Sequence, residues 1–356
     1  MISKINMTRF TGKKLLIAPL DWGLGHATRC IPIIKELIAI NCTVWLAGEK
    51  AQEKLLREEF PNLPFIPLKG YRIRYSASGV AGKILLQVPK ILRAIKDENN
   101  WLKAQVSKYG FDGVISDNRY GLYHDKIFSV FIAHQLTIKS PFGKWSEKIL
   151  RQWNYKFINH FNECWVPDDE NEDNLAGELS HPEKLPDIPV KYIGPLSRFV
   201  RKDSYGEETE AEEKKDHLLI ILSGPEPHRT LLEEKIIGEI AHYNGTATIV
   251  RGLPSAENII PSTNNIRFHN HLPSKILNKE MKKAEFVISR TGYSTVMDIA
   301  KMKKKSILIP TPGQPEQEYL ASYLSGKRIA FCLNQKDFSL LQTLNEAHLF
   351  NYCINY

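Results

Sequence analysis

The sequence has no long apolar run and few cysteines, and both absences narrow the class of protein. No stretch approaches the roughly 18 consecutive apolar residues of a membrane-spanning helix, and the first residues lack the apolar core of a secretory signal peptide. The five cysteines show neither a CxxC pair nor any other metal-ligand spacing. We therefore expect reduced, buried thiols in a cytoplasmic protein that is neither exported nor integral to a membrane.

Acidic residues are also outnumbered by basic ones, and the net charge is +8. A basic chain favours anionic partners, which include the phosphates of a small ligand, a membrane surface and nucleic acid, and the charge alone does not choose among them. With 42% hydrophobic and 25% charged residues in 356, disorder is excluded as the dominant state, and there is room for two domains of ordinary size.

Short apolar runs alternate with helix-period segments along both halves of the chain, which predicts an α/β protein with two Rossmann-like parallel-sheet domains. We place the domains at residues 1–196 and 217–356, joined by a charged linker at 197–216 that is poor in apolar residues. The strands that we expect are 14–20, 43–47, 113–116 and 129–133 in the first half, and 217–222, 246–250, 286–288 and 306–309 in the second.

The most informative stretch runs from Glu285 to Ala321, where a strand, a glycine turn at Gly292 and a helix are followed by a second such unit. Backbone N–H groups at a helix start bind anions, and the hydroxyls of Ser294 and Thr295 add donors. The Asp298 carboxylate suits the vicinal diol of a ribose. The alternative is that Ser294 only caps the helix and Asp298 is solvated in its first turn.

The same stretch resembles the donor-site signature of GT-B nucleotide-sugar glycosyltransferases. The likeness is greatest to glycosyltransferase family 28 and the N-acetylglucosaminyltransferase of peptidoglycan synthesis, whose pattern is Arg-Ser-Gly-x-x-Thr-x-x-Glu. Here the run from Arg290 to Asp298 fits it with Thr291 in place of Ser and Asp298 in place of Glu, and Pro310-Thr311-Pro312 follows.

The resemblance implies a role for each matching residue in holding a UDP-sugar. Asp298 would hold the ribose, the loop from Thr291 to Thr295 the diphosphate, and Glu316 and Gln317 the sugar. The residues His271 and Leu272 fall where the family holds the base through backbone contacts.

Other turns of the second half add cations at the carboxyl ends of the predicted strands. Ser223 and Gly224 follow the strand at 217–222, Gly224 allows close backbone approach, and Arg229 is placed for an oxygen-rich anion. With Arg251 and Arg290, three arginines share this edge of the sheet. His269 and His271 lack a third ligand at a recognisable spacing, so we expect no metal site.

The first half offers two candidates for a general base. His26 follows Gly23 and Gly25 at the start of a helix, and histidine titrates near neutrality; the alternative is a capping or core histidine. The Gly-x-Gly-His loop resembles the acceptor-domain loop of the family. The other candidate is Asp117, at the end of the strand 113–116. Other polar residues at the strand ends predict an acceptor pocket. With Gly23 and Gly25, the residues that we expect to line it are Asn118, His134, Gln135 and Thr137.

Two segments mix apolar residues with basic or aromatic ones at helical spacing. Residues 79–106 either lie on an anionic membrane or form a surface helix with its apolar face on the sheet. The stripe of Trp145, Ile149, Trp153, Phe157 and Phe161 predicts a helix face buried in the core.

Taken with the resemblance, these features predict domains that face a cleft in a GT-B arrangement and catalyse inverting, metal-independent glycosyl transfer. His26 or Asp117 removes a proton from the acceptor, which is a hydroxyl of a cell-envelope glycan or lipid-linked molecule at the inner face of the membrane. The donor is a UDP-sugar, by family analogy an N-acetylhexosamine. No cofactor and no nucleic acid is expected, and the absence of an Asp-x-Asp triplet agrees with a metal-independent reaction.

Three alternatives remain at this stage. A UDP-sugar epimerase or hydrolase of the same fold needs the donor site but replaces the acceptor pocket. A nicotinamide enzyme needs a third glycine where this chain has Thr28. A non-catalytic membrane-associated binding module uses the helix at 79–106 and leaves His26 and Asp117 dispensable.

Overall fold

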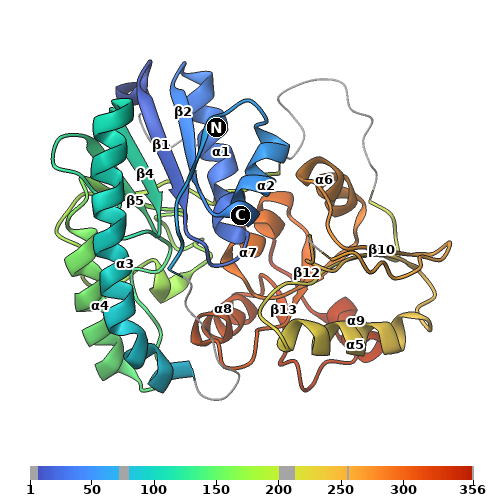
Figure 1. Ribbon diagram of the computed structural model, residues 1–356. Coiled ribbons are helices and arrows are strands. Elements are labelled where there is room, and N and C mark those ends of the chain that lie inside the picture. The colour runs from blue at the N-terminus through green and yellow to red at the C-terminus, as the bar shows by residue number, and fades with distance from the viewer. Residues whose placement is uncertain (1–6, 72–79, 200–212, 255, 355–356) are drawn as a thin grey trace. The chain divides into compact units, whose positions relative to one another are not determined.

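A computed structural model describes residues 7–71, 80–199, 213–254 and 256–354. The chain forms two compact units, Met1–Arg198 and Phe199–Tyr356. Each is built around a parallel sheet with helices packed against it (Figure 1). Most of the predicted linker, residues 200–212, lies outside the described residues.

The first unit contains a seven-stranded parallel sheet, in the order β3-β2-β1-β4-β5-β6-β7. Its strands are β1 (Lys14–Pro19), β2 (Thr43–Gly48), β3 (Phe65–Pro67), β4 (Gly113–Asp117), β5 (Phe128–Ile132), β6 (Glu163–Val166) and β7 (Val190–Tyr192). Because β1 pairs with β2 on one side and β4 on the other, the strand order reverses at β1. Crevices at such reversals are the usual ligand sites of open α/β sheets.

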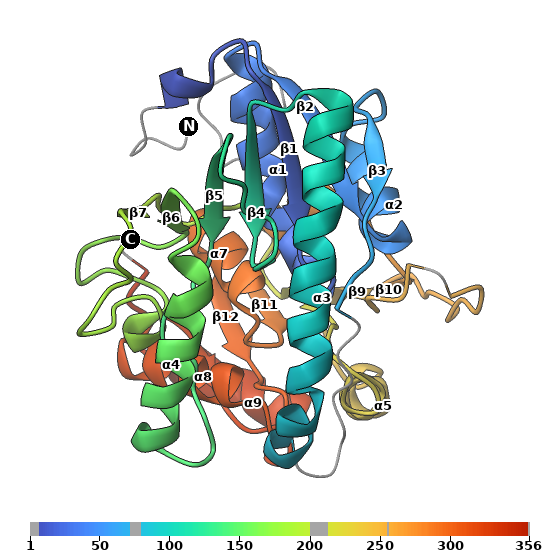
Figure 2. The ribbon, with the colours of Figure 1, turned by 60° about the vertical axis from the view of Figure 1, so that its left-hand side comes forward.

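Helices cover both faces of this sheet, with α3 and α4 in front and α1 behind in Figure 2. Alternate residues of β1 explain the layering, since Leu16 and Ala18 pack in one buried cluster with Leu102 of α3. The helices of the unit are η1 (Met7–Phe10), α1 (Gly25–Ala39), α2 (Lys50–Glu59), α3 (Val80–Tyr109), α4 (Lys144–Ile158) and η2 (Gly177–Leu179).

The second unit contains a six-stranded parallel sheet, in the order β10-β9-β8-β11-β12-β13. The strands are β8 (His217–Ile221), β9 (Thr246–Val250), β10 (Ile266–His269), β11 (Phe286–Ser289), β12 (Lys305–Leu308) and β13 (Phe331–Cys332). The helices are α5 (His228–Ile240), α6 (Ser274–Lys283), α7 (Tyr293–Met302), α8 (Pro315–Gly326) and α9 (Leu340–Leu349). Here β8 lies between β9 and β11, so the turns after β8 and β11 are neighbours.

The predicted α/β class with two parallel sheets is confirmed, and all eight predicted strands are present with ends that agree to within one residue. The strands β3, β6, β7, β10 and β13 were not predicted. Each has only two to four residues. Segments this short carry little periodicity, although β11 and β12, with four residues each, were predicted from their apolar runs.

The stripe on α4 is not buried as predicted. Trp145 is 75% exposed, Trp153 51% and Ile149 38%, whereas Phe161 beyond the helix end is 3% exposed. The periodicity was correct, but the sheet covers a different side of the helix, where Asn154, Tyr155 and Ile158 are buried.

The helix predicted at 79–106 is α3, and its described part packs on the sheet through Ile95 and Leu102. This agrees with the surface-helix interpretation; the side chains of residues 80–87 lie outside the described residues. No described helix has the length and apolarity to span a bilayer. All five cysteines are free thiols, but Cys353 is exposed and Cys332 is only half-buried, so the prediction of buried thiols is wrong for these two.

Candidate functional site

Four side chains converge at the carboxyl edge of the first sheet, where the strand order reverses. Asp117 is the last residue of β4, His134 follows β5 by two residues, and His26 and Arg29 lie in the first turn of α1. They come from two strand ends and one helix start, and the parallel sheet brings them to one edge. The structure thus brings together the predicted residues His26, Asp117 and His134.

Arg29 is the centre of this cluster, and the sequence analysis did not single it out. Its guanidinium is 2% exposed and donates to both carboxylate oxygens of Asp117, with Nε 2.8 Å from Oδ2. Its Nη1 lies 2.9 Å from Nδ1 of His134. A guanidinium has only donors, so this Nδ1 accepts, and neutral His134 carries its proton on Nε2.

The environment leaves Asp117 charged and His26 neutral. Burial by itself would raise the pKa of Asp117, but the Arg29 charge and the hydrogen bonds from Arg29 and His26 outweigh it and lower that pKa to about 2. Burial lowers the pKa of His26, and the neighbouring Arg29 charge lowers it further. A neutral imidazole is the form that a general base requires.

Two neighbours compete for Nδ1 of His26. Asp117 Oδ2 lies 3.2 Å away and accepts if Nδ1 carries the proton, whereas Arg29 Nη2 lies 2.9 Å away and donates if it does not. Only the first arrangement leaves the lone pair on Nε2, where it can accept a substrate proton. Because Asp117 is fully buried, we assign it the role of orienting His26 and not that of contacting substrate.

The other predicted acceptor residues lie in the loops around this cluster. Asn118 adopts the left-handed conformation with φ 59° and donates its backbone N–H to Ile132 O at 3.0 Å, which ties the ends of β4 and β5 together. Gln135 is half-buried, and its carbonyl accepts from Asn154 of α4 at 3.1 Å. Thr137 is buried. Gly23 and Gly25 lie in the turn that opens α1.

In the second unit, Gly224 lies in the turn after β8 with φ 104°, a conformation that L side chains rarely adopt. A Cβ built there would be 3.4 Å from Oγ1 of Thr311 and 4.0 Å from Nε of Arg290. Turns that follow β8, β11 and β12 therefore meet at Gly224. They belong to three adjacent strands of the sheet.

Several buried polar atoms at this edge have no hydrogen-bond partner among the described residues. They are Nε of Arg290, Oγ1 of Thr291, Oγ1 of Thr311 and Nδ1 of His228. Buried polar groups are normally paired, so this group of unpaired ones is the candidate ligand site of the second unit.

Arg290 is held in place by neutral oxygens. Its Nη2 donates to His228 O and to Oε1 of Gln335, both at 2.6 Å, and its Nη1 to the carbonyls of Ile309 and Pro310. Burial lowers the pKa of Arg290 to about 10, which leaves it charged at neutral pH. None of these four partners is a carboxylate, so the charge of Arg290 is available to an anion.

The other two predicted anion-binding arginines have acidic partners. Arg229 and Arg251 both bind Glu233 of α5, at 3.1 Å and 2.6 Å respectively, and Arg229 also binds Glu226. The shared carboxylate joins the turns after β8 and β9. Sequence spacing placed these arginines at the right edge but did not show that Glu233 pairs with both.

The remaining predicted donor residues lie on or beside this edge. Asp298 is buried in the second turn of α7, which begins directly after Gly292, and Ser294 and Thr295 lie in its first turn. Gln317 accepts the backbone N–H of Thr311 at 2.9 Å. Ser223 precedes Gly224, Glu316 precedes Gln317, and His271 and Leu272 follow β10, with Leu272 buried.

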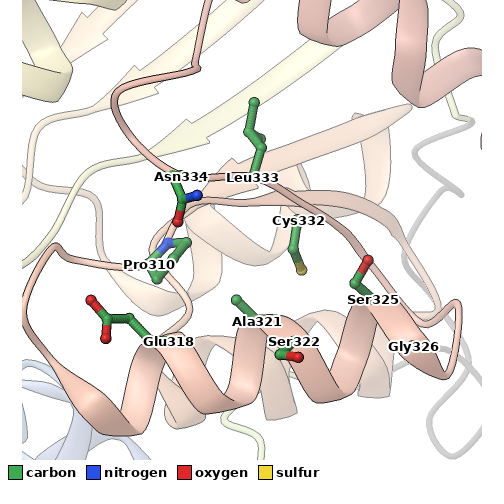
Figure 3. Close-up of a pocket in the computed structure, with 9 residues that line it drawn as sticks. All are labelled: Pro310, Glu318, Ala321, Ser322, Ser325, Gly326, Cys332, Leu333 and Asn334. Atoms are coloured by element: carbon green, nitrogen blue, oxygen red, sulfur yellow. The ribbon is translucent and has the colours of Figure 1, made fainter. Parts of the chain in front are cut away.

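A cavity of about 370 Å³ lies beside this edge, between α8 and the segment after β13 (Figure 3). Small and polar side chains of α8, including Ser322 and Ser325, form one wall, and Pro310 and Asn334 form another. Pro310 also accepts a hydrogen bond from Arg290. None of the predicted donor residues lines the cavity. In the described part of the chain, no three His, Cys, Asp or Glu side chains are grouped as metal ligands.

The comparisons with known proteins agree with this geometry. Residues 264–351, which contain β11, α7, β12 and α8, match the glycosyltransferase family 28 C-terminal domain. No curated protein matches the chain.

Solved structures of similar fold cover nearly the whole chain. The glycotransferase of kitacinnamycin is 14% identical with a TM-score of 0.64, covering 95% of this chain and 90% of its own. MurG of Acinetobacter baumannii is 13% identical with a TM-score of 0.53, at 95% and 91% coverage. Spinosyn rhamnosyltransferase SpnG complexed with thymidine diphosphate is 13% identical with a TM-score of 0.58, at 95% and 89% coverage. The chain therefore has the GT-B fold, as predicted, and its residues 264–351 match the family 28 C-terminal domain.

Proposed function

We propose that the chain transfers a sugar, with inversion and without a metal ion, from a UDP-sugar to a hydroxyl group of an acceptor. The observation that carries the proposal is the set of unpaired buried polar atoms around Gly224, with Arg290 the cation among them. A diphosphate supplies acceptors for Nε of Arg290 and for the hydroxyls of Thr291 and Thr311.

On this proposal, the second unit holds the donor along one edge. The diphosphate lies over Gly224 and the N-terminus of α7, where the helix dipole favours an anion. Asp298 accepts from the ribose hydroxyls, the loop with His271 and Leu272 holds the base, and Glu316 and Gln317 contact the sugar. These roles follow the family resemblance. Arg290 and the helix N-terminus stabilise the charge that develops on the leaving diphosphate.

The first unit supplies the general base. His26 takes the acceptor proton on Nε2, the acceptor oxygen bonds to the anomeric carbon, and the bond from that carbon to the diphosphate oxygen breaks. The nucleoside diphosphate leaves with the electron pair. Asp117 holds the Nδ1 proton and stabilises the imidazolium that forms. The residues that contact the acceptor are Gly23, Gly25, Asn118, His134, Gln135 and Thr137.

We further propose that residues 1–196 bind the acceptor and that residues 217–356 bind the donor. The acceptor is a cell-envelope glycan or a lipid-linked molecule, and the sugar is an N-acetylhexosamine, as the family resemblance implies. A structure of similar fold, the spinosyn rhamnosyltransferase SpnG, is complexed with spinosyn aglycone, so the acceptor class is tested separately.

The experiment begins with calorimetric titration of UDP and thymidine diphosphate into the purified protein. Incubation with UDP-sugars follows, with analysis of released UDP in the presence and absence of hydroxyl and lipid-linked acceptors. UDP release that requires an acceptor supports the proposal. Free sugar without an acceptor indicates a hydrolase, and an inverted sugar still on its nucleotide indicates an epimerase. Absence of nucleotide affinity supports a non-catalytic binding module and contradicts the proposal.

A further inference from the structure

The segment between β13 and α9, residues 333–339, lies at the carboxyl edge of the second sheet and contacts Arg290. It begins with Leu333 and Asn334, which are labelled in Figure 3. The next residue, Gln335, is 7% exposed, and its Oε1 lies 2.6 Å from Nη2 of Arg290. A guanidinium has only donors, so the amide oxygen of Gln335 is the acceptor.

Helix α5 fixes this segment in place. Nζ of Lys235 donates to three backbone carbonyls of the segment at 3.0, 3.1 and 3.3 Å, which are those of Gln335, Lys336 and Phe338. One turn later in α5, the carboxylate of Glu239 accepts from the hydroxyl of Ser339 at 2.9 Å. An ammonium group has three donors, so three carbonyls satisfy Lys235. The backbone position of Gln335 is therefore set by α5.

The same helix supplies a second acceptor for Nη2 of Arg290. His228, the first residue of α5, accepts from it through its carbonyl at 2.6 Å. One acceptor of Nη2 thus belongs to α5, and α5 holds the other through Lys235. Because Nη1 donates to the carbonyls of Ile309 and Pro310, Nε is the buried donor of the guanidinium that no described residue satisfies.

Gln335 provides a neutral acceptor at this position. An amide oxygen orients the guanidinium without cancelling its charge, whereas a carboxylate of nearly the same shape would form a buried ion pair with Arg290. The backbone carbonyls that hold Arg290 are neutral as well. An incoming anion therefore meets a positive charge that is oriented but has no carboxylate among these partners.

We propose that Gln335 is a positioning residue of the donor site, which holds the Arg290 guanidinium so that Nε and the positive charge are left for the diphosphate. Lys235 acts one step further away, by fixing Gln335. The inference rests on the proposed binding of a nucleoside diphosphate at Arg290, and it adds a residue from a segment that the family signature does not include.

The test compares a ligand that has phosphates with one that has none. Gln335→Glu is expected to bind UDP about 10–100-fold more weakly, because the introduced carboxylate pairs with Arg290 in place of the diphosphate. Gln335→Met removes the acceptor without adding a charge and is expected to weaken UDP binding about 2–10-fold. Both variants are expected to bind uridine as the unmodified protein does. Calorimetry measures UDP affinity and ligand-observed NMR titration measures uridine affinity.

Lys235→Met tests the contact that fixes the segment, and it is expected to weaken UDP binding without changing uridine binding. The matched control is Lys336→Met, which removes the same charge from an exposed position of the segment and is expected to leave both affinities unchanged. Circular dichroism checks that each variant is folded. If Gln335→Glu does not fold, the comparison of Gln335→Met and Lys235→Met with the control decides the question.

The inference is overturned if Arg290→Met weakens UDP binding while Gln335→Glu binds UDP as the unmodified protein does. It is also overturned if the Gln335 variants lose UDP and uridine affinity equally, because that result indicates a general structural defect. Absence of UDP binding by the unmodified protein, or full UDP affinity in Arg290→Met, removes the proposed diphosphate site itself and the inference with it.

Discussion

At the scale of single residues, Arg29 determines what the cluster in the first unit does. A carboxylate buried as fully as Asp117 would by burial alone tend to be neutral, and Arg29 keeps it charged. The same cation opposes protonation of His26. Arg29 therefore supports a neutral base next to an ionised partner, although we do not expect it to contact substrate.

Replacement of Arg29 with Met is expected to move the acidic limb of the kcat/KM profile to higher pH. Arg29 lowers the pKa of His26, so its removal raises that pKa, and the neutral base is lost at a higher pH as the solution is acidified. The other titratable groups near the His26 ring, which are Asp117, His134 and the Cys30 thiol, are unchanged in this variant. The measurement is the pH dependence of UDP release. Arg29→Lys retains the charge and is expected to shift the limb less; an unmoved limb in folded Arg29→Met contradicts the argument.

Asp117→Asn is expected to lower kcat by about 10²–10⁴-fold, the usual contribution of an oriented general base, with donor affinity little changed. Asparagine retains the shape but neither the charge nor the preference for a proton on Nδ1 of His26. Steady-state kinetics with calorimetric titration of UDP separates the two effects. Equal losses in turnover and UDP affinity would indicate a structural role instead.

The same carboxylate makes stability depend on pH. Its pKa falls from 3.8 to about 2 on folding, so its stabilisation is complete above pH 4 and is lost as the pH falls through about 2. A shift of this size corresponds to roughly 2 kcal/mol of unfolding free energy. Urea unfolding at pH 5 and pH 3 is expected to show a larger loss for the unmodified protein than for Asp117→Asn. Parallel losses would indicate that other carboxylates dominate.

Asp298→Ala is expected to weaken UDP affinity by about 1–3 kcal/mol, the cost of losing a charged hydrogen-bond acceptor. Titration calorimetry measures it directly. Asp337→Ala removes an exposed carboxylate of the same unit and is the control, expected to leave the affinity unchanged. Unchanged affinity in Asp298→Ala would remove the ribose role.

At the scale of elements, the turn between β8 and α5 needs a glycine for two reasons. Gly224 has φ 104°, and its missing Cβ leaves open the space beside Thr311 and Arg290. Gly224→Ala is therefore expected to destabilise the fold by roughly 1–2 kcal/mol and to weaken nucleotide binding at least about tenfold. Gly238→Ala, in the interior of α5 with no atom near its Cβ position, is the control and is expected to be neutral or slightly stabilising. Thermal unfolding and UDP titration test both; normal affinity in folded Gly224→Ala would move the diphosphate elsewhere.

At the scale of the whole molecule, the division into two compact units has a thermodynamic consequence. Each unit has its own sheet and its own buried residues, and one cluster of the second unit runs from Leu218 to Ala347. We expect scanning calorimetry to resolve two transitions, only one of which rises with UDP. At a UDP concentration of about 100 Kd the stabilisation of that unit is roughly 2.7 kcal/mol. A single transition, or two transitions whose midpoint temperatures rise equally with UDP, would contradict donor binding by the second unit alone.

The sequence by itself determined the α/β class, the longer strands and the edge of each sheet where polar residues gather, because these depend on local periodicity and on residues within one strand–turn–helix unit. The pattern from Arg290 to Asp298 identified the family 28 domain for the same reason. What only the tertiary structure decided were pairings between distant segments. Glu233 forms ion pairs with Arg229 and Arg251, and Arg29 binds Asp117, 88 residues away.

The spacing of Arg29 three residues after His26 did place both on one face of a helix, but it did not show that a buried carboxylate faced them. The prediction that the apolar stripe of α4 is buried was wrong for the converse reason. Periodicity shows that a helix has an apolar face, and only packing decides whether the sheet or the solvent meets it.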